Sequence, residues 1–312
     1  MGIATCEDAV TLATGQVFAT HALRDNLMAV LFPRGEGLPS ELLQSRVKLK
    51  LQSLVLGVER ALLSSDATRS LSWDVLSNSG LLREPELIDF ALARIAEDKL
   101  RKNIQAASTS SILGQLPVTL LGHENDRLSD MARKFLYAQQ ISESENNQLF
   151  LQLDSEPLHL LCWRVVAALL ENKSAESDVL SAAAQTLLSN HQADLNPAAM
   201  ARKLVFFLGH EYRTELKDPT KSGLHLFVAS LDQDYGLGSD FLMRLIGGDH
   251  VAPLLLLLKG QSLAVGEVPN VMSALRGNVT DNYGLDDCQA AYERLDPVEA
   301  RAAVATWKLE RS

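Results

Sequence analysis

Apolar residues recur three and four positions apart along most of the chain, which is the spacing of a helix with one buried face. This pattern predicts a long helix over residues 7–32 and a second helix that opens at Pro39-Ser40-Glu41 and runs toward Ser64. The segment 33–37 contains proline and glycine and is predicted to be a turn. Because two helices joined by a short connection usually pack side by side, we expect residues 1–64 to form a helical hairpin.

Prolines preceded by polar residues mark the starts of three later helices. A side chain that accepts a hydrogen bond from an unpaired backbone N–H stabilises a first helical turn, and proline has no N–H to leave unpaired there. The three pairs are Glu156-Pro157, Asn196-Pro197 and Asp296-Pro297. Ser239 is predicted to cap a further helix over residues 241–246 in the same way.

The most apolar run extends from Val251 to Leu258. Eight helical residues rise only about 12 Å, which is too short to cross a bilayer, so the run is predicted to be a buried helix. Asp249 is its expected N-cap, Pro253 is tolerated in the first turn, and Gly260 is expected to end the helix in the left-handed conformation. Because this helix is apolar on every side, it is the expected centre of a C-terminal core.

The chain as a whole is predicted to be all-α. No segment shows the sustained alternation and β-branched enrichment of a strand. About fourteen to sixteen short helices with brief connections favour a HEAT-like, solenoid-like stack of antiparallel helices over a four-helix bundle. The polar segment 142–147 suggests a boundary between an N-terminal region, 1–147, and a C-terminal helical-repeat region, 148–312.

Composition and charge narrow the function classes. The chain is 46% hydrophobic and 22% charged, as in ordinary folded proteins, and its net charge of −10 divides into −4 for residues 1–155 and −6 for residues 156–312. Because nucleic-acid binding needs a basic face, a nucleic-acid partner is not expected. The three widely spaced cysteines, Cys6, Cys162 and Cys288, fit free thiols in a reducing compartment. Residues 1–32 lack the pattern of a signal peptide, so we expect a cytoplasmic protein with no membrane partner.

The C-terminal third resembles an uncharacterised bacterial family of all-helical proteins with HEAT-like repeats. The resemblance covers roughly residues 220–310 and lies in the cadence of short apolar helices and glycines. It is carried by Leu226-Phe227-Val228 with Leu231, Gly236-Leu237, residues 241–246, and residues 254–260 followed by another short helix. It implies a curved helical stack and supplies no catalytic residue.

His21 offers a chemical alternative. The segment from His21 to Leu27 looks like the phospho-accepting box of two-component histidine kinases, with the pattern His-x-Leu-Arg-x-x-Leu on the first arm of a helical hairpin. An exposed imidazole nitrogen in such a site attacks a phosphoryl group. Ala22 stands where that family has an acidic residue, and no glycine-rich ATP-binding region follows. The hypothesis is therefore a phosphorelay protein, and its competing interpretation is a histidine packed on a second apolar stripe.

The remaining candidates carry no recognisable chemistry. His123, His210 and His250 lack the His-x-x-x-His spacing that places two metal ligands on one helix face, so neither a metal nor a cofactor is expected. The glycines at 236 and 238 are predicted to form a helix-start loop, since no strand precedes them. The sequence therefore favours a non-enzymatic helical-repeat protein that binds another protein, with a homodimer through the N-terminal hairpin as a further expectation.

Overall fold

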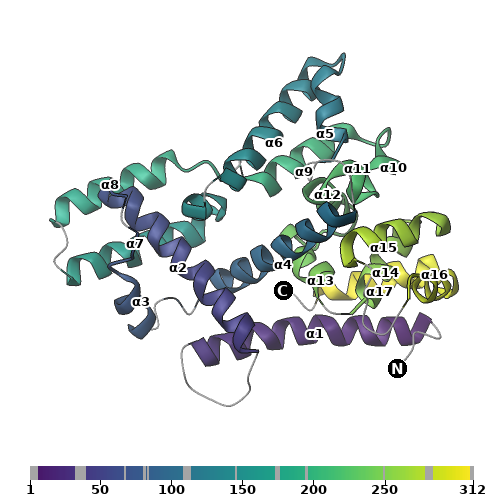
Figure 1. Cartoon of the computed structure of the whole chain (residues 1–312), viewed down its shortest axis with the longest axis horizontal. Coiled ribbons are helices and arrows are strands. Elements are labelled where there is room, and N and C mark those ends of the chain that lie inside the picture. Colours follow the sequence, from purple (N-terminus) through teal and green to yellow (C-terminus); the bar gives the residue numbers. More distant parts are fainter. Residues whose placement is uncertain are drawn as a thin grey trace. The chain divides into compact units, whose positions relative to one another are not determined.

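The fold is all-α, as the sequence predicts. The computed structural model describes residues 6–31, 40–66, 68–79, 82, 84–107, 114–144, 146–172, 176–193, 196–248, 250–277 and 284–309 (Figure 1). Within these ranges every regular element is helical and no strand is present. The elements are α1 (Cys6–Leu31), α2 (Glu41–Leu63), α3 (Trp73–Ser79), α4 (Pro85–Ala107), α5 (Leu116–Thr119), η1 (Leu120–Gly122), α6 (Asp126–Ser144), η2 (Asn146–Gln152), α7 (Ser155–Glu171), α8 (Ser177–Asn190), α9 (Pro197–Leu208), α10 (Arg213–Leu216), α11 (Pro219–Ser222), α12 (Leu224–Tyr235), α13 (Ser239–Gly247), α14 (Ala252–Gly260), η4 (Val265–Glu267), α15 (Val268–Arg276), α16 (Leu285–Arg294) and α17 (Pro297–Leu309).

The chain divides into two compact units. Unit 1 consists of Met1–Ala22, Ala93–Leu136 and Met200–Ser312, and unit 2 consists of Leu23–Leu92 and Tyr137–Ala199. Each unit therefore takes residues from both sides of the boundary predicted near residue 147, and separate N- and C-terminal regions stay a prediction. The helices expected in the first 64 residues are present as α1 and α2. Because the turn between them lies outside the described residues, their pairing as a hairpin and a homodimer through it also stay predictions.

Unit 2 is organised around α2. This helix packs against η2, α7 and α8, and α3 packs against α7. Ser40 caps α2, because its hydroxyl accepts a 3.3 Å hydrogen bond from the Leu43 N–H. The buried face of α2 includes Val47, Leu51, Leu54, Val55, Val58 and Leu62.

One buried carboxylate in unit 2 binds the loop that precedes α3. Glu59 accepts hydrogen bonds from the Ser70 hydroxyl at 2.8 Å, the Leu71 N–H at 3.0 Å and the Ser72 N–H at 2.5 Å. The Ser72 hydroxyl also donates to it. Because Glu59 satisfies these donors, residues 70–72 form a fixed loop, and α3 begins after them at Trp73.

Unit 1 has its core around α14, the apolar run of the sequence. This helix packs against α13, α16 and α17 (Figure 1), and every side chain from Leu254 to Leu258 is fully buried. Parts of α1 and α4 complete the same core through Ala9, Ala13, Val17, Ala93, Leu100 and Ile104. The prediction that the run is a buried central helix is therefore confirmed.

The predicted helix caps are confirmed at two positions and wrong at two others. The Asn196 side chain accepts a 2.6 Å bond from the Ala199 N–H at the start of α9, and Asp296 accepts 2.8 Å and 3.0 Å bonds at the start of α17. Ser239 is instead the first residue of α13, after Gly238. Likewise, α7 begins at Ser155, which places Glu156 inside its first turn. The expected cap at Asp249 lies outside the described residues.

Gly260 has a different role from the one predicted. It is the last residue of α14 and is not left-handed; the left-handed residue is Ser262, with φ 55°. The Leu263 N–H then donates to the Leu258 carbonyl at 3.1 Å, which closes the helix end. A Cβ at residue 260 would collide with the Tyr235 hydroxyl, so glycine is required here by a close approach.

Candidate functional site

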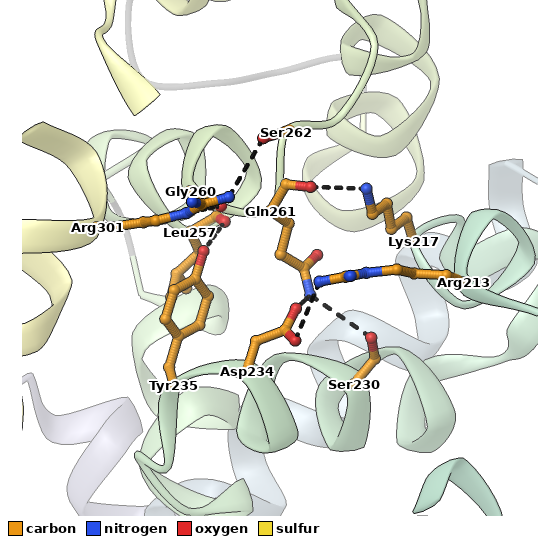
Figure 2. A network of polar contacts seen from close by, with 10 residues as sticks. All are labelled: Arg213, Lys217, Ser230, Asp234, Tyr235, Leu257, Gly260, Gln261, Ser262 and Arg301. Carbon is orange, nitrogen blue, oxygen red and sulfur yellow. Dashed lines mark hydrogen bonds and ion pairs between the residues drawn. The ribbon is translucent and has the colours of Figure 1, made fainter. Parts of the chain in front are cut away.

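A network of polar side chains surrounds the C-terminal end of α14 (Figure 2). The last carbonyl groups of a helix have no partner within it, and they carry partial negative charge. Here the Tyr235 hydroxyl donates to the Leu257 carbonyl at 2.6 Å, and Arg301 Nε donates to the Gly260 carbonyl at 2.6 Å. Burial raises the pKa of the Tyr235 phenol well above its ordinary value, which keeps it a donor. The end of α14 is therefore bound by side chains of α12 and α17.

Lys217 completes this network from the turn after α10. Its Nζ donates to the Gln261 carbonyl at 2.6 Å, while Gln261 Nε2 donates to Asp234 Oδ2 at 2.8 Å. Burial lowers the pKa of Lys217, as does the positive charge of Arg213, whereas Asp234 opposes the shift. Because the amine and guanidinium groups are directed at main-chain oxygens, the network acts as a structural cap for α14.

A second polar cluster is buried where α4 meets α12 and α13. Arg94 NH1 lies 2.7 Å from Glu97 Oε2, and Arg94 NH2 lies 2.7 Å from Asp240 Oδ1. His225 Nε2 lies 3.1 Å from Glu97 Oε1, and Arg101 NH1 is 3.7 Å from the same oxygen. The Glu97 side chain, only 6% exposed, thus faces three nitrogen-bearing groups.

The Glu97 carboxylate is held in its ionised form by the groups around it. Burial alone would raise the pKa of Glu97, but the charges of Arg94, His225 and Arg101 outweigh it and hold the pKa far below its ordinary range. The carboxylate is therefore ionised throughout the neutral range, as a structural ion pair requires. Breaking such a pair leaves an uncompensated buried charge, so the cluster holds α4 against the core of unit 1.

Aromatic side chains gather instead on an outer face of unit 1, at the end of α9. Phe206 is 70% exposed, and its ring lies edge-on to the ring of Phe207, with 5.6 Å between centroids. The guanidinium carbon of Arg127, on α6, lies 4.2 Å from the centroid of the Phe207 ring. We call Arg127, Arg202, Lys203, Phe206 and Phe207 the α9 face.

The neighbouring segments place more rings and apolar groups at this end of unit 1. His123, before α6, and Tyr212, after α9, make an edge-on ring contact with centroids 6.3 Å apart. The α5–η1 segment that leads to His123 exposes Val118 and Leu121. Isolated exposed apolar residues are ordinary, whereas exposed aromatic side chains with a stacked arginine are typical of protein-binding surfaces.

The structure describes some of the sequence-derived candidates and not others. His21 lies in α1, but its side chain is outside the described part, so nothing tests its predicted role. The glycine segment is a helix junction, as expected: Gly236 ends α12 in the left-handed conformation and Gly238 precedes α13. Within the described ranges, His, Cys, Asp and Glu form no group of three that could hold a metal ion.

Comparison with known proteins does not assign this chain to a family. No protein-family model, curated protein or solved structure matches this chain. In the described part, no helix is both long and apolar enough to cross a membrane. The α9 face is a part of the described surface where aromatic and cationic side chains lie together.

Proposed function

We propose that this chain is a non-enzymatic, all-helical protein that binds another protein, and that Phe206 lies at the centre of its binding surface. The carrying observation is the 70% exposure of Phe206 beside Phe207 and the stacked Arg127. Leaving an aromatic ring in water forgoes roughly 1.5–3 kcal/mol of burial, so a partner that covers Phe206 gains that free energy.

The surroundings of Phe206 support this proposal. Phenylalanine and arginine are enriched at protein interfaces, and a few central side chains usually supply most of the binding free energy. The α9 backbone is anchored beneath the surface by the buried residues Met200, Leu204 and Leu208. A partner would therefore meet a preorganised helix face, which reduces the entropy lost on binding.

A displayed library of random twelve-residue peptides tests the proposal. The peptides are selected on the purified full chain and then measured against two variants, Phe206→Ser and Val298→Ser. Val298 is the matched control, since it is also in unit 1 and 72% exposed but lies on α17. We expect selected peptides to bind the Val298 variant normally and the Phe206 variant about tenfold or more weakly.

The folded state of each variant is checked first by circular dichroism and urea unfolding. Substitutions at exposed positions should change the free energy of unfolding by no more than about 0.5 kcal/mol. Equal peptide binding to both variants would place the binding surface elsewhere and overturn the assignment to Phe206.

Histidine phosphotransfer through His21 stays a separate prediction. It is tested by incubation with phosphorylated receiver domains and a His21→Ala control.

A further inference from the structure

The α9 face is locally basic in an acidic protein. The chain has a net charge of −10, yet the segment 197–209 contains Arg202 and Lys203 and no aspartate or glutamate. Both cationic residues share a side of α9 with Phe206, because they lie four and three positions before it in the helix. The exposed ring is therefore bordered along α9 by positive charge.

Arg127 adds a third cationic group from α6. Its guanidinium lies over the Phe207 ring, and the Arg127 side chain is exposed. An arginine in this position can contact the ring and still donate N–H groups to a partner. Neither Arg127 nor Arg202 forms an ion pair with another described residue, and both are exposed. Within the described part of the chain, two guanidinium groups thus accompany Phe206 and Phe207, and no carboxylate forms an ion pair with either of them.

Acidic residues near the α9 face could neutralise its cationic groups, but they have other positions or partners. Asp130, one turn after Arg127 on α6, is engaged by Lys134 at 2.8 Å. Glu211 lies beyond the end of α9, after the left-handed Gly209, and burial together with Glu211 and Glu215 raises the pKa of Tyr212. Among the described residues, none of the acidic groups on these segments forms an ion pair with Arg127 or Arg202.

We propose that the α9 face binds a peptide segment of another protein in which an apolar side chain is flanked by carboxylates. The apolar side chain covers Phe206, and the carboxylates pair with Arg127 and Arg202. Planar guanidinium groups bind carboxylates through two parallel N–H···O bonds, which sets the position of the peptide as well as attracting it. This inference names the partner's chemistry and rests on the proposed function.

The composition of the selected peptides tests this inference separately from the binding role of Phe206. Among peptides from the random library that require Phe206, aspartate and glutamate should be enriched next to an aromatic or aliphatic residue. Their affinity should fall as salt is raised from low to physiological concentration, because exposed charges are screened. We expect the double variant Arg127→Glu with Arg202→Glu to weaken these peptides by about tenfold or more.

A charge reversal at Arg133 provides the control, since Arg133 is also exposed on α6 but lies about 240° around the helix from Arg127. Arg133→Glu should leave peptide affinity unchanged, and a new selection on the double variant should enrich lysine and arginine. Phe206-dependent peptides with no preference for carboxylates would overturn the inference while leaving the proposed function intact. A selection without any Phe206-dependent peptide would overturn both.

Discussion

Tyr235 and Gly260 approach each other so closely that residue 260 has no room for a side chain. A Cβ there would collide with the Tyr235 hydroxyl, which donates its 2.6 Å hydrogen bond to the Leu257 carbonyl. The glycine therefore lets a residue of α12 close the end of α14, the helix at the centre of unit 1. This contact joins the apolar core to the polar network around it.

We predict that Tyr235→Phe lowers the free energy of unfolding by about 1–2 kcal/mol, because the Leu257 carbonyl loses its donor at the helix end. Urea unfolding measures this change. The slope of the unfolding free energy against urea concentration should stay the same, because the surface exposed on unfolding does not change. Tyr137→Phe is the control, since the Tyr137 ring is exposed. Equal stabilities of the Tyr235 variant and the parent chain would show that water replaces the hydroxyl at no cost.

Gly260→Ala should destabilise the chain by about 1–3 kcal/mol, because the new methyl group overpacks against the Tyr235 hydroxyl. The same substitution should cost less in the Tyr235→Phe background, where that oxygen is absent. Unfolding of the two single variants and the double variant forms a double-mutant cycle. Strictly additive costs would show that the two residues are not coupled.

Glu97 should make stability fall in acid. Its pKa in the folded chain is lowered, so its contribution is complete above the ordinary glutamate pKa of about 4.3 and is lost as pH falls below that value. We expect Glu97→Gln to lower stability at pH 7 by about 3 kcal/mol and to reduce the loss of stability between about pH 5 and 3. Chemical denaturation across this range measures both effects. If the Glu97 variant lost as much stability in acid as the parent chain, Glu97 would not be the group responsible for the loss.

Glu59→Gln should loosen the loop before α3, because its amide would present N–H groups to the donors from Ser70, Leu71 and Ser72. We predict a loss of about 2–3 kcal/mol and faster hydrogen exchange at the Leu71 and Ser72 amides. Glu171→Gln, on an exposed site of the same unit, is the control. Unchanged exchange at these amides would mean that the loop is held by other contacts.

Leu255→Asp should unfold unit 1, with a loss of about 4 kcal/mol or more, since Leu255 is fully buried and its surroundings offer an aspartate no partner. Val298→Asp, on the exposed side of α17, should be nearly neutral. Near-UV circular dichroism and urea unfolding compare the two variants. A stable Leu255 variant would contradict the placement of α14 at the centre of the core.

The all-α fold was predictable because its signals are local. Apolar residues at helical spacing and capping residues such as Asn196 and Asp296 act within one or two turns of their own helix. The role of Gly260 was not predictable, since it depends on Tyr235, which is distant in sequence. The same applies to the Glu97 cluster, whose partners come from three separate helices.

The α9 face was only partly visible in the sequence. The apolar pattern of α9 comprises Met200, Leu204, Phe207 and Leu208, of which Phe207 is only partly buried and the other three are buried. Phe206 lies off that stripe. Its position in the sequence was therefore a usable sign of exposure. The stacking of Arg127 on Phe207 joins α6 and α9 across about eighty residues of sequence, and no local pattern predicts it.

The most direct measurement of the proposed binding role replaces Phe206 with photo-activatable benzoylphenylalanine in the full chain, within the cells that naturally produce it. The same substitution at Val298 is the matched control, as both side chains are exposed. We predict a discrete adduct from residue 206 and none from residue 298. Mass spectrometry should locate the adduct in one protein that also binds the purified chain, and binds its Phe206→Ser variant about tenfold more weakly. No adduct from residue 206, or identical adducts from both positions, would contradict the account.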